Sequence, residues 1–432
     1  MKLFILISAI LSLPSYGPEL PLGKHPVVII PVNFSNENWH PDPWDKMQSR
    51  VERYARDLAR RYDSYSRGQV ELVGQSGNGP ITVYPPQSVS VSKSCGNRSP
   101  AKTEINARLN LPKLTAKVWL FPYRTCSYAN ASGGDINTSG KLNGMTVTHE
   151  MGHIFRLGHG SSFKWGKDGT IIGLDNYGDR STTMGHWSSS TYNAPQLHQM
   201  GWLKDEEVVQ VEDGGIYQLR RLDYYGRSVS GYLSALAHKT PHGNWLYISY
   251  RRQSKWTGVY FDDDKGFAAN IDADCERRCP MHATALVGYF GPHFEDETGL
   301  VVDTLEQDYR SAKVKVTLKE PTCGQPIDIT TAHHRVRKAS QRTRGLDDIT
   351  ITVTNPNQPP CRPVMVAQKI RLVLPKGSSY RRMDRFPGWF YAGESKSFKT
   401  RVRIPKPKEG EEPKIQIIVG NLSIVETVAV IQ

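Results

Sequence analysis

The first two hundred residues combine β-branched apolar runs with amphipathic helical patterns. Residues 25–34 (HPVVIIPVNF) are β-branched and bounded by prolines, which predicts a buried strand. From Pro43 to Arg61, apolar residues recur at spacings of three and four, which predicts an amphipathic helix. Further strand-like runs cover 69–73, 81–84 and 117–121, and a second helical stretch covers 102–109. The pattern predicts a mixed α/β unit over residues 18–208.

The pattern changes twice further along the chain. Residues 126–144 are rich in Gly, Ser and Asn and are expected to form a loop, followed by a helix that begins near Met145. Beyond residue 208, short alternating runs separated by turn signals predict a β-rich region over 209–334. These runs are 216–222, 244–252, 258–262, 284–290 and 313–319.

The last part of the chain predicts another unit. Residues 335–346 are basic and lack aromatic side chains, so we expect a linker there. Residues 347–432 contain about five to seven strand-like runs, which is typical of a small β-sandwich, immunoglobulin-like in outline. The fold class expected from the whole pattern is therefore mixed α+β with a C-terminal sandwich.

The N-terminus resembles an export signal. Residues 1–17 contain one lysine, an apolar run from Leu3 to Leu13, and then Pro14 and small residues, which is the layout of a secretory signal peptide. The run is too short to span a bilayer, and no later stretch approaches 18 uninterrupted apolar residues. We therefore expect a secreted, extracellular protein without a membrane span.

Cysteine usage agrees with that compartment. The six cysteines are an even number beyond the predicted signal, and in an oxidising environment this favours disulfide bonds, with the pairing left open. Cys275 and Cys279 lack the second nearby pair that a zinc knuckle requires. The cysteines are Cys95, Cys126, Cys275, Cys279, Cys323 and Cys361.

The charge of the chain is concentrated at its C-terminal end. The sequence has 55 Lys and Arg against 42 Asp and Glu, a formal net charge of +13. From Arg335 onward there are 19 Lys and Arg against 8 Asp and Glu, so most of the excess lies there. No nucleic-acid-reading module is recognisable, so we do not expect a nucleic-acid partner. The basic domain predicts docking on an anionic wall or glycan surface, and a merely solvated strand face is the alternative.

The candidate chemistry lies in residues 148–160 (THEMGHIFRLGHG). His149 and His153 stand four residues apart, so on a helix they share one face and can bind one metal ion. Glu150 can reach a metal-bound water, and His159 offers a third nitrogen beyond the helix. Three imidazoles with one open position are the ligand set of catalytic zinc, for which Glu150 would serve as general base and then as general acid.

These residues carry a resemblance. The motif resembles that of the metzincins, in which the chain turns back after the second histidine to deliver the third. Residues 177–186 (YGDRSTTMGH) resemble the metzincin Met-turn, with Met184 beneath the metal, and 193–202 (NAPQLHQMGW) continue the likeness. The combination is similar to the gametolysin family of secreted endopeptidases that dissolve glycoprotein cell walls. The resemblance implies a metzincin-like catalytic domain that binds Zn²⁺.

The sequence departs from the metzincin pattern in three places. Arg156 stands where metzincins have glycine at the bend, so either Arg156 adopts the left-handed conformation or Gly158 and Gly160 form the turn. His186 replaces a tyrosine and can bind zinc, stabilise an oxyanion or simply pack. No cysteine precedes Cys95, so we expect no cysteine-switch propeptide.

The functional expectation is a secreted zinc endopeptidase that cleaves extracellular or cell-wall proteins and glycoproteins. The alternative is an inactive surface or glycan-binding protein on a decayed metzincin scaffold, and the residue that keeps this alternative open is Arg156. A zinc amidase that acts on wall peptides or glycans shares the metal chemistry. A gluzincin is disfavoured, because no glutamate occurs between Glu150 and Glu206 to act as the third ligand.

A second metal site is weakly indicated. Residues 262–275 contain a cluster of aspartates that suggests either a Ca²⁺ site or a solvated acidic loop. The spacing of an EF-hand is absent, which favours the acidic loop. The aspartates are Asp262, Asp263, Asp264, Asp272 and Asp274.

Overall fold

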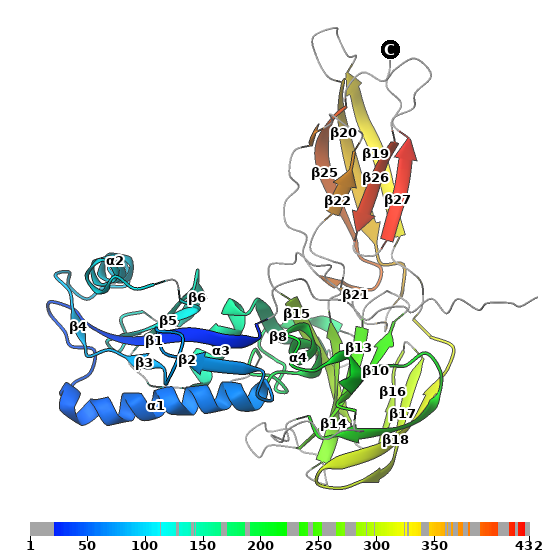
Figure 1. Cartoon of the computed structure of the whole chain (residues 1–432). Helices are drawn as coiled ribbons and strands as arrows, with labels where there is room; N and C mark the ends of the chain where they lie inside the picture. Colours follow the sequence, from blue (N-terminus) through cyan, green and yellow to red (C-terminus); the bar gives the residue numbers. More distant parts are fainter. Residues whose placement is uncertain are drawn as a thin grey trace, which may run out of the picture.

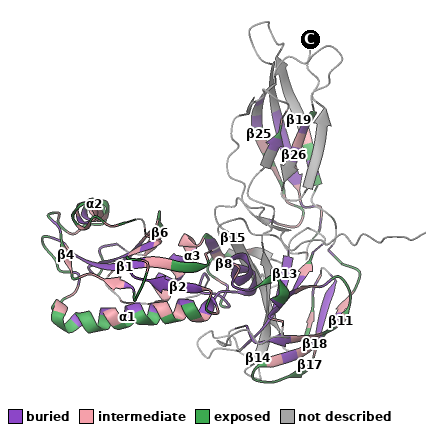
Figure 2. Ribbon diagram, in the orientation of Figure 1, coloured by how far each residue is buried: buried purple, intermediate pink, exposed green. Residues whose placement is uncertain are grey.

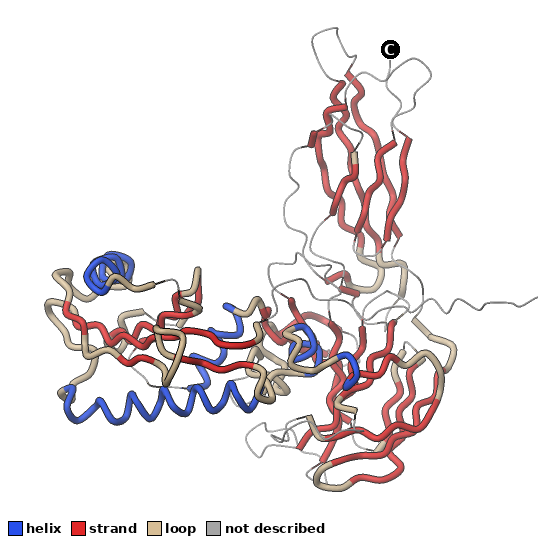
Figure 3. Tube along the Cα trace, viewed as in Figure 1, coloured by secondary structure: helices blue, strands red, loops and turns tan. Residues whose placement is uncertain are grey.

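The computed structural model shows a mixed α+β protein with several sheets and few helices (Figures 1 and 3). The residues it describes are 21–112, 114–126, 129–139, 142, 144–165, 171–185, 191–222, 233–240, 245–252, 265–272, 282–290, 292–297, 299–323, 325, 328–337, 345–358, 361, 364–365, 370–374, 379–380, 389–404, 414–419 and 422–427. Among them, no helix is long and apolar enough to cross a membrane. Outside them lie the predicted signal peptide 1–17, the run 258–262, His186, Cys275, Cys279 and most of the aspartate cluster.

The N-terminal unit is built on a sheet around β1. The strand order is β2-β1-β5-β7-β6, and the short strands β3 and β4 also pair with β1. All these pairs are parallel except β6 with β7, which is antiparallel. The strands are β1 (Gly23–Asn33), β2 (Val70–Val73), β3 (Thr82–Val83), β4 (Gln87–Ser88), β5 (Ala116–Phe121), β6 (Asn130–Ser132) and β7 (Asp135–Ser139).

Helices cover both faces of this sheet. Alternate side chains of β1 point to opposite faces, so each face presents apolar residues that a helix can cover. Val27 and Ile29 belong to the core beneath α1, and Val28 and Ile30 belong to the core beneath α2. Figure 2 shows the buried strands beside the largely exposed outer side of α1. The helices are α1 (Trp44–Tyr65), α2 (Arg98–Leu109) and α3 (Gly144–Ile154). The strand predicted at 25–34 and the helices predicted near 43–61 and 102–109 are confirmed.

The loop expected over 126–144 is wrong for part of its length. Strands β6 and β7 occupy this polar segment, and β7 pairs with β5 inside the sheet. Asn137 and Thr138 are buried, and the Thr138 hydroxyl donates to the carbonyl of Trp119 at 3.2 Å. Backbone pairing with β5 and side-chain hydrogen bonds thus provide partners for the buried polar groups of β7. Because its residues are polar, apolar periodicity could not reveal this strand.

A second sheet crosses the expected boundary at residue 208. Its order is β10-β12-β13-β14-β15-β8-β9, so two strands from the N-terminal unit join five from the β-rich region. Strand β8 runs parallel to β15 and antiparallel to β9. The strands are β8 (Leu157–Trp165), β9 (Ile171–Asp175), β10 (Val208–Gln210), β12 (Ala235–Lys239), β13 (Trp245–Arg252), β14 (Lys265–Asp272) and β15 (His282–Phe290). Helix α4 (Ala194–Gln199) and the short helix η1 (Asp205–Glu207) precede β10.

A third sheet completes the β-rich region. Its order is β11-β18-β17-β16, and it shares an apolar core with strands β12 and β13, through residues such as Leu236 and Ile248. The strands are β11 (Gly215–Arg220), β16 (His293–Glu295), β17 (Leu300–Gln307) and β18 (Ser311–Leu318). The β-rich character predicted for this region is confirmed.

The C-terminal unit contains two larger sheets, β19-β20-β25-β23 and β22-β26-β27, and a two-stranded pair, β21-β24. Figure 1 shows this unit projecting away from the rest of the chain. The strands are β19 (Asp328–Arg337), β20 (Gly345–Thr354), β21 (Val364–Met365), β22 (Ile370–Val373), β23 (Ser379–Tyr380), β24 (Trp389–Phe390), β25 (Ser395–Ile404), β26 (Lys414–Val419) and β27 (Leu422–Thr427).

The linker expected at 335–346 is wrong at both of its ends. Residues 335–337 end β19 and residues 345–346 begin β20, and these two strands pair antiparallel. The basic residues of this segment suggested a linker, but backbone pairing between β19 and β20 forms strands at both ends regardless of side-chain charge. The first strand of the C-terminal sheets, β19, begins at Asp328.

Two disulfides link the described cysteines. Cys95–Cys126 joins the segment before α2 to the segment after β5, and Cys323–Cys361 joins the β-rich region to the C-terminal unit. Disulfides of this kind persist in oxidising compartments and are compatible with an extracellular protein.

Candidate metal centre

Helix α3 holds the first two histidines because its apolar face is fixed in the core. Val147 and Met151 are buried, and these two residues anchor the helix against the sheet. His149 and His153 lie one turn apart on another face, with ring centroids 4.8 Å apart. The prediction that these two histidines share one face of a helix is confirmed.

The bend after α3 resolves the alternative that the sequence left open. Arg156 has a φ of 68°, whereas Gly158 and Gly160 are not among the described residues with positive φ. The Arg156 N–H donates to the carbonyl of His153 at 3.0 Å, which closes the end of the helix. Arg156 itself therefore adopts the left-handed conformation and turns the chain into β8.

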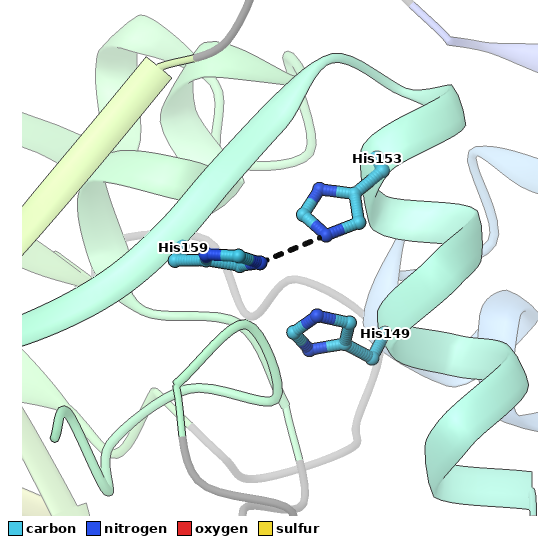
Figure 4. Close-up of side chains that lie close together, drawn as sticks. All are labelled: His149, His153 and His159. Carbon is cyan, nitrogen blue, oxygen red and sulfur yellow. Dashed lines mark hydrogen bonds between the residues drawn. The ribbon is translucent and has the colours of Figure 1, made fainter. Parts of the chain in front are cut away.

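Strand β8 returns His159 to the helix. Figure 4 shows His149 and His153 on the helix and His159 on the facing strand, with the three rings directed toward one another. One nitrogen from each ring lies within 4.8 Å of the others, and Nε2 of His159 lies 3.1 Å from Nε2 of His153. These three residues are the described group that could hold a metal ion.

The hydrogen bonds of the rings suit a metal. Nδ1 of His149 donates to the carbonyl of Thr183 at 2.9 Å, and Nδ1 of His153 donates to the carbonyl of Leu157 at 2.9 Å. In neutral imidazoles, these bonds place the lone pair on Nε2, where a metal accepts it. Nitrogens about 2.1 Å from a tetrahedral zinc lie about 3.4 Å apart, close to the His153–His159 spacing. The three residues therefore could hold a metal ion, and the spacing of this pair is compatible with zinc.

Burial keeps these rings neutral. Burial first, and then the charge of the neighbouring histidines, lowers the pKa of His149 and of His159 to about 4. The pKa of His153 is also lowered by burial. Because a protonated imidazole cannot bind a metal, the site is prepared to accept a cation near neutral pH.

Glu150 lies buried beside the first histidine. Burial raises the pKa of its carboxyl to about 7, and a hydrogen bond from the backbone of Ala131 on β6 opposes the rise. A carboxyl that titrates near neutral pH can both accept and release a proton during a reaction. These are the properties required of the predicted general base and acid.

Met184 lies beneath the histidine helix. It is fully buried, and a Cβ placed on Gly152 would come within 2.3 Å of its sulfur. The methionine thus packs on the backbone of α3 directly beside His153, which requires a residue without a side chain at 152. The predicted supporting position of Met184 is consistent with this contact, whereas His186 lies outside the described residues.

Tyr177 is a site residue that sequence reasoning included only as part of a motif. Its ring centroid lies 4.1 Å from that of His159 and 5.9 Å from that of His149, and its side chain remains exposed. Burial and the charge of Glu150 raise its pKa. The position of Tyr177 in the sequence, seven residues before Met184, did not indicate that it lies beside the histidines. That proximity depends on the antiparallel pairing of β9 with β8.

No family model, curated protein or solved structure matches this chain. The site is consequently defined by its own geometry: three convergent neutral imidazoles that could hold a metal ion, and a buried carboxyl of raised pKa next to them.

Proposed function

We propose that the protein is a secreted zinc-dependent endopeptidase that hydrolyses peptide bonds of extracellular or cell-wall proteins and glycoproteins. The observation that carries the proposal is the convergence of His149, His153 and His159, with Glu150 adjacent and buried. A merely structural zinc site has four protein ligands, whereas the described residues offer three, as in catalytic sites.

The histidines would hold the metal, and zinc, when bound, would supply the Lewis acidity that makes water nucleophilic near neutral pH. Glu150 would take the proton from the attacking water. The N–H of Ala131 would keep the carboxylate oriented toward the site. Glu150 would then deliver the same proton to the nitrogen of the leaving amine, so that the peptide bond breaks without expelling an amide anion.

The finer structural assignments belong to the same proposal. The parallel sheet with its antiparallel edge strand β6, the helix α3 and the turn at Met184 support a metzincin-like catalytic unit related to the gametolysin family. The two larger sheets of the C-terminal unit support an immunoglobulin-like sandwich. The disulfides and the leader-like residues 1–17 support secretion.

The C-terminal unit would dock the enzyme on an anionic wall or glycan. Its support is the excess of 19 Lys and Arg over 8 Asp and Glu from Arg335 onward. Such attraction is screened by salt, so binding to isolated wall material should weaken as the salt concentration rises from about 0.05 to 0.5 M. Salt-independent binding would favour a solvated strand face with no docking role.

Casein zymography of the full chain with and without 1,10-phenanthroline tests the enzyme proposal. We expect chelator-sensitive clearing, and we expect Glu150→Gln to lower kcat by about 10²- to 10⁴-fold with zinc still bound. Glu212→Gln, an exposed change away from the site, is the matched control. No clearing by zinc-loaded wild type would favour the non-catalytic binding protein, and cleavage of wall fragments but not of denatured proteins would favour the amidase.

A further inference from the structure

The segment around Met184 is fastened by a buried arginine from the β-rich region. We call residues 179–185 and 191–193 the Met184 segment. Arg251 on β13 donates from Nη1 to the carbonyl of Ser181 at 2.5 Å and from Nη2 to the carbonyl of Tyr192 at 2.8 Å. One guanidinium therefore bridges the two described parts of the Met184 segment.

A buried carboxylate completes this attachment. Asp179 is fully buried, and it accepts hydrogen bonds from the Ser181 N–H at 2.7 Å and from the Asn193 side-chain amide at 3.0 Å. Burial raises the pKa of Asp179, and the charge of Arg251 is among the factors that oppose the rise. The Arg251 side chain thus binds carbonyl groups of this short segment, and the Asp179 side chain binds N–H groups of the same segment.

Both parts of the Met184 segment contact the metal-ligand helix. The carbonyl of Thr183, two residues after Ser181, accepts the Nδ1–H of His149 at 2.9 Å. The hydroxyl of Tyr192 donates to the carbonyl of Thr148 at 2.9 Å, immediately before that histidine. A shift of the Met184 segment would therefore displace the acceptor that orients His149.

The third ligand depends on the same region. Strand β8, which carries His159, is hydrogen-bonded to β15 from residue 282 onward. The N–H of Gly160 also donates to the carbonyl of Met184 at 3.0 Å, and the N–H of Asp179 donates to the carbonyl of Gly160 at 3.2 Å. The Met184 segment thus lies between the strand of one ligand and the helix of the other two.

We propose that Arg251 is a positioning residue of the metal centre, so that the β-rich region completes the site instead of only packing behind it. This inference rests on the metal binding assumed in the proposed function. The role requires arginine, because its planar fork presents two donors that can reach two carbonyls at once. A lysine at this position has one ammonium group on a flexible stem and cannot reproduce both contacts.

The test is a Co²⁺ titration of the full chain, followed by absorption spectroscopy. We expect Arg251→Met to lower Co²⁺ affinity about 10- to 100-fold, as losses of groups that orient metal ligands do, and Arg251→Lys to fall between it and wild type. The matched control is Arg221→Met. Arg221 is another buried arginine of the β-rich region, and it donates to the carbonyl of Tyr309, away from the Met184 segment. This control should keep wild-type affinity within about threefold.

A role in stability alone gives a different result. Near-UV circular dichroism identifies the variants that remain folded, and if Arg251→Met does not fold, Arg251→Lys decides. Wild-type Co²⁺ affinity and an unchanged Co²⁺ spectrum in the folded Arg251 variant would overturn the inference. Tight Co²⁺ binding by wild type without proteolysis would overturn the proposed function and leave the role of Arg251 intact. A wild-type chain that binds no Co²⁺ would overturn both.

Discussion

Nδ1 of His149 lies 2.9 Å from the carbonyl oxygen of Thr183, the residue directly before Met184. The contact joins helix α3 to a segment 34 residues further along the chain. Because Nδ1 donates, Nε2 keeps the lone pair that a metal requires. The orientation of the His149 ring therefore depends on the position of the turn that contains the buried methionine.

Close packing between Gly152 and Met184 makes the first prediction. In Gly152→Ala the new methyl group would lie 2.3 Å from the Met184 sulfur, so the helix or the turn must shift. We expect a loss of about 1–3 kcal/mol in unfolding free energy, together with weaker zinc binding. Denaturant unfolding and metal titration measure the two effects.

Gly144→Ala is the matched control for this prediction. A Cβ at position 144 would first meet the Arg61 guanidinium at 3.3 Å, the end of a flexible side chain. The same substitution at the start of the same helix should therefore cost little, because alanine is the better helix former. Equal losses in the two variants would contradict the packing role of Gly152.

The left-handed conformation of Arg156 makes the second prediction. Its φ of 68° places Cβ too close to the following carbonyl oxygen, at a cost of roughly 1–2 kcal/mol. We expect Arg156→Gly to raise the unfolding free energy by about 1 kcal/mol relative to Arg156→Ala, which keeps the Cβ and removes only the guanidinium. Denaturant unfolding with chelator present measures the difference, and equal stabilities would contradict backbone strain at this bend.

Metal linkage makes the third prediction. Zinc that binds only the folded chain stabilises it by about 2.7 kcal/mol at a concentration of 100 times Kd. Adding zinc to chelator-treated protein should therefore raise the thermal midpoint of the wild type. His159→Ala should lose this rise, whereas His293→Ala, on the exposed strand β16, should keep it. A zinc-dependent rise that persists in His159→Ala would exclude this residue as a ligand.

The buried His198 makes the fourth prediction. Nδ1 of His198 lies 2.8 Å from the Tyr247 hydroxyl and Nε2 lies 3.1 Å from the Asp205 carboxylate, so this ring joins α4 to β13 and η1. Burial lowers its pKa below the ordinary 6.5, although Asp205 opposes the shift. The unfolded chain therefore binds more protons than the folded chain between the folded-state pKa and 6.5, and stability falls as the pH drops through that window.

The measurement is denaturant unfolding at pH values between about 7.5 and 5 with chelator present, which removes the contribution of the metal. Because glutamine does not titrate, His198→Gln should lose less stability over this range than the wild type does. At pH 7.5 the variant should be the less stable of the two, since the contacts with Tyr247 and Asp205 are impaired. Parallel pH curves for the two proteins would show that His198 does not contribute to the acid sensitivity.

The sequence by itself determined the features that depend on local spacing. A helix repeats every 3.6 residues, so the four-residue separation of His149 and His153 was sufficient to place them together. The apolar spacing of α1 was informative for the same reason. The run of β1 was informative because β-branched side chains favour strands. For the bend after the helix, the sequence left two alternatives, a left-handed Arg156 or a turn at Gly158 and Gly160, because only a few backbone geometries permit so sharp a turn.

Only the tertiary structure decided the rest, because hydrogen bonds between distant segments leave no periodic signal. The polar strand β7 is held by β5, and β8 with its His159 is held by β15, more than a hundred residues later. Likewise, nothing near Arg251 in the sequence indicates the two carbonyls that it binds. The sequence thus supplied the three histidines, and long-range pairing decided which distant residues orient them.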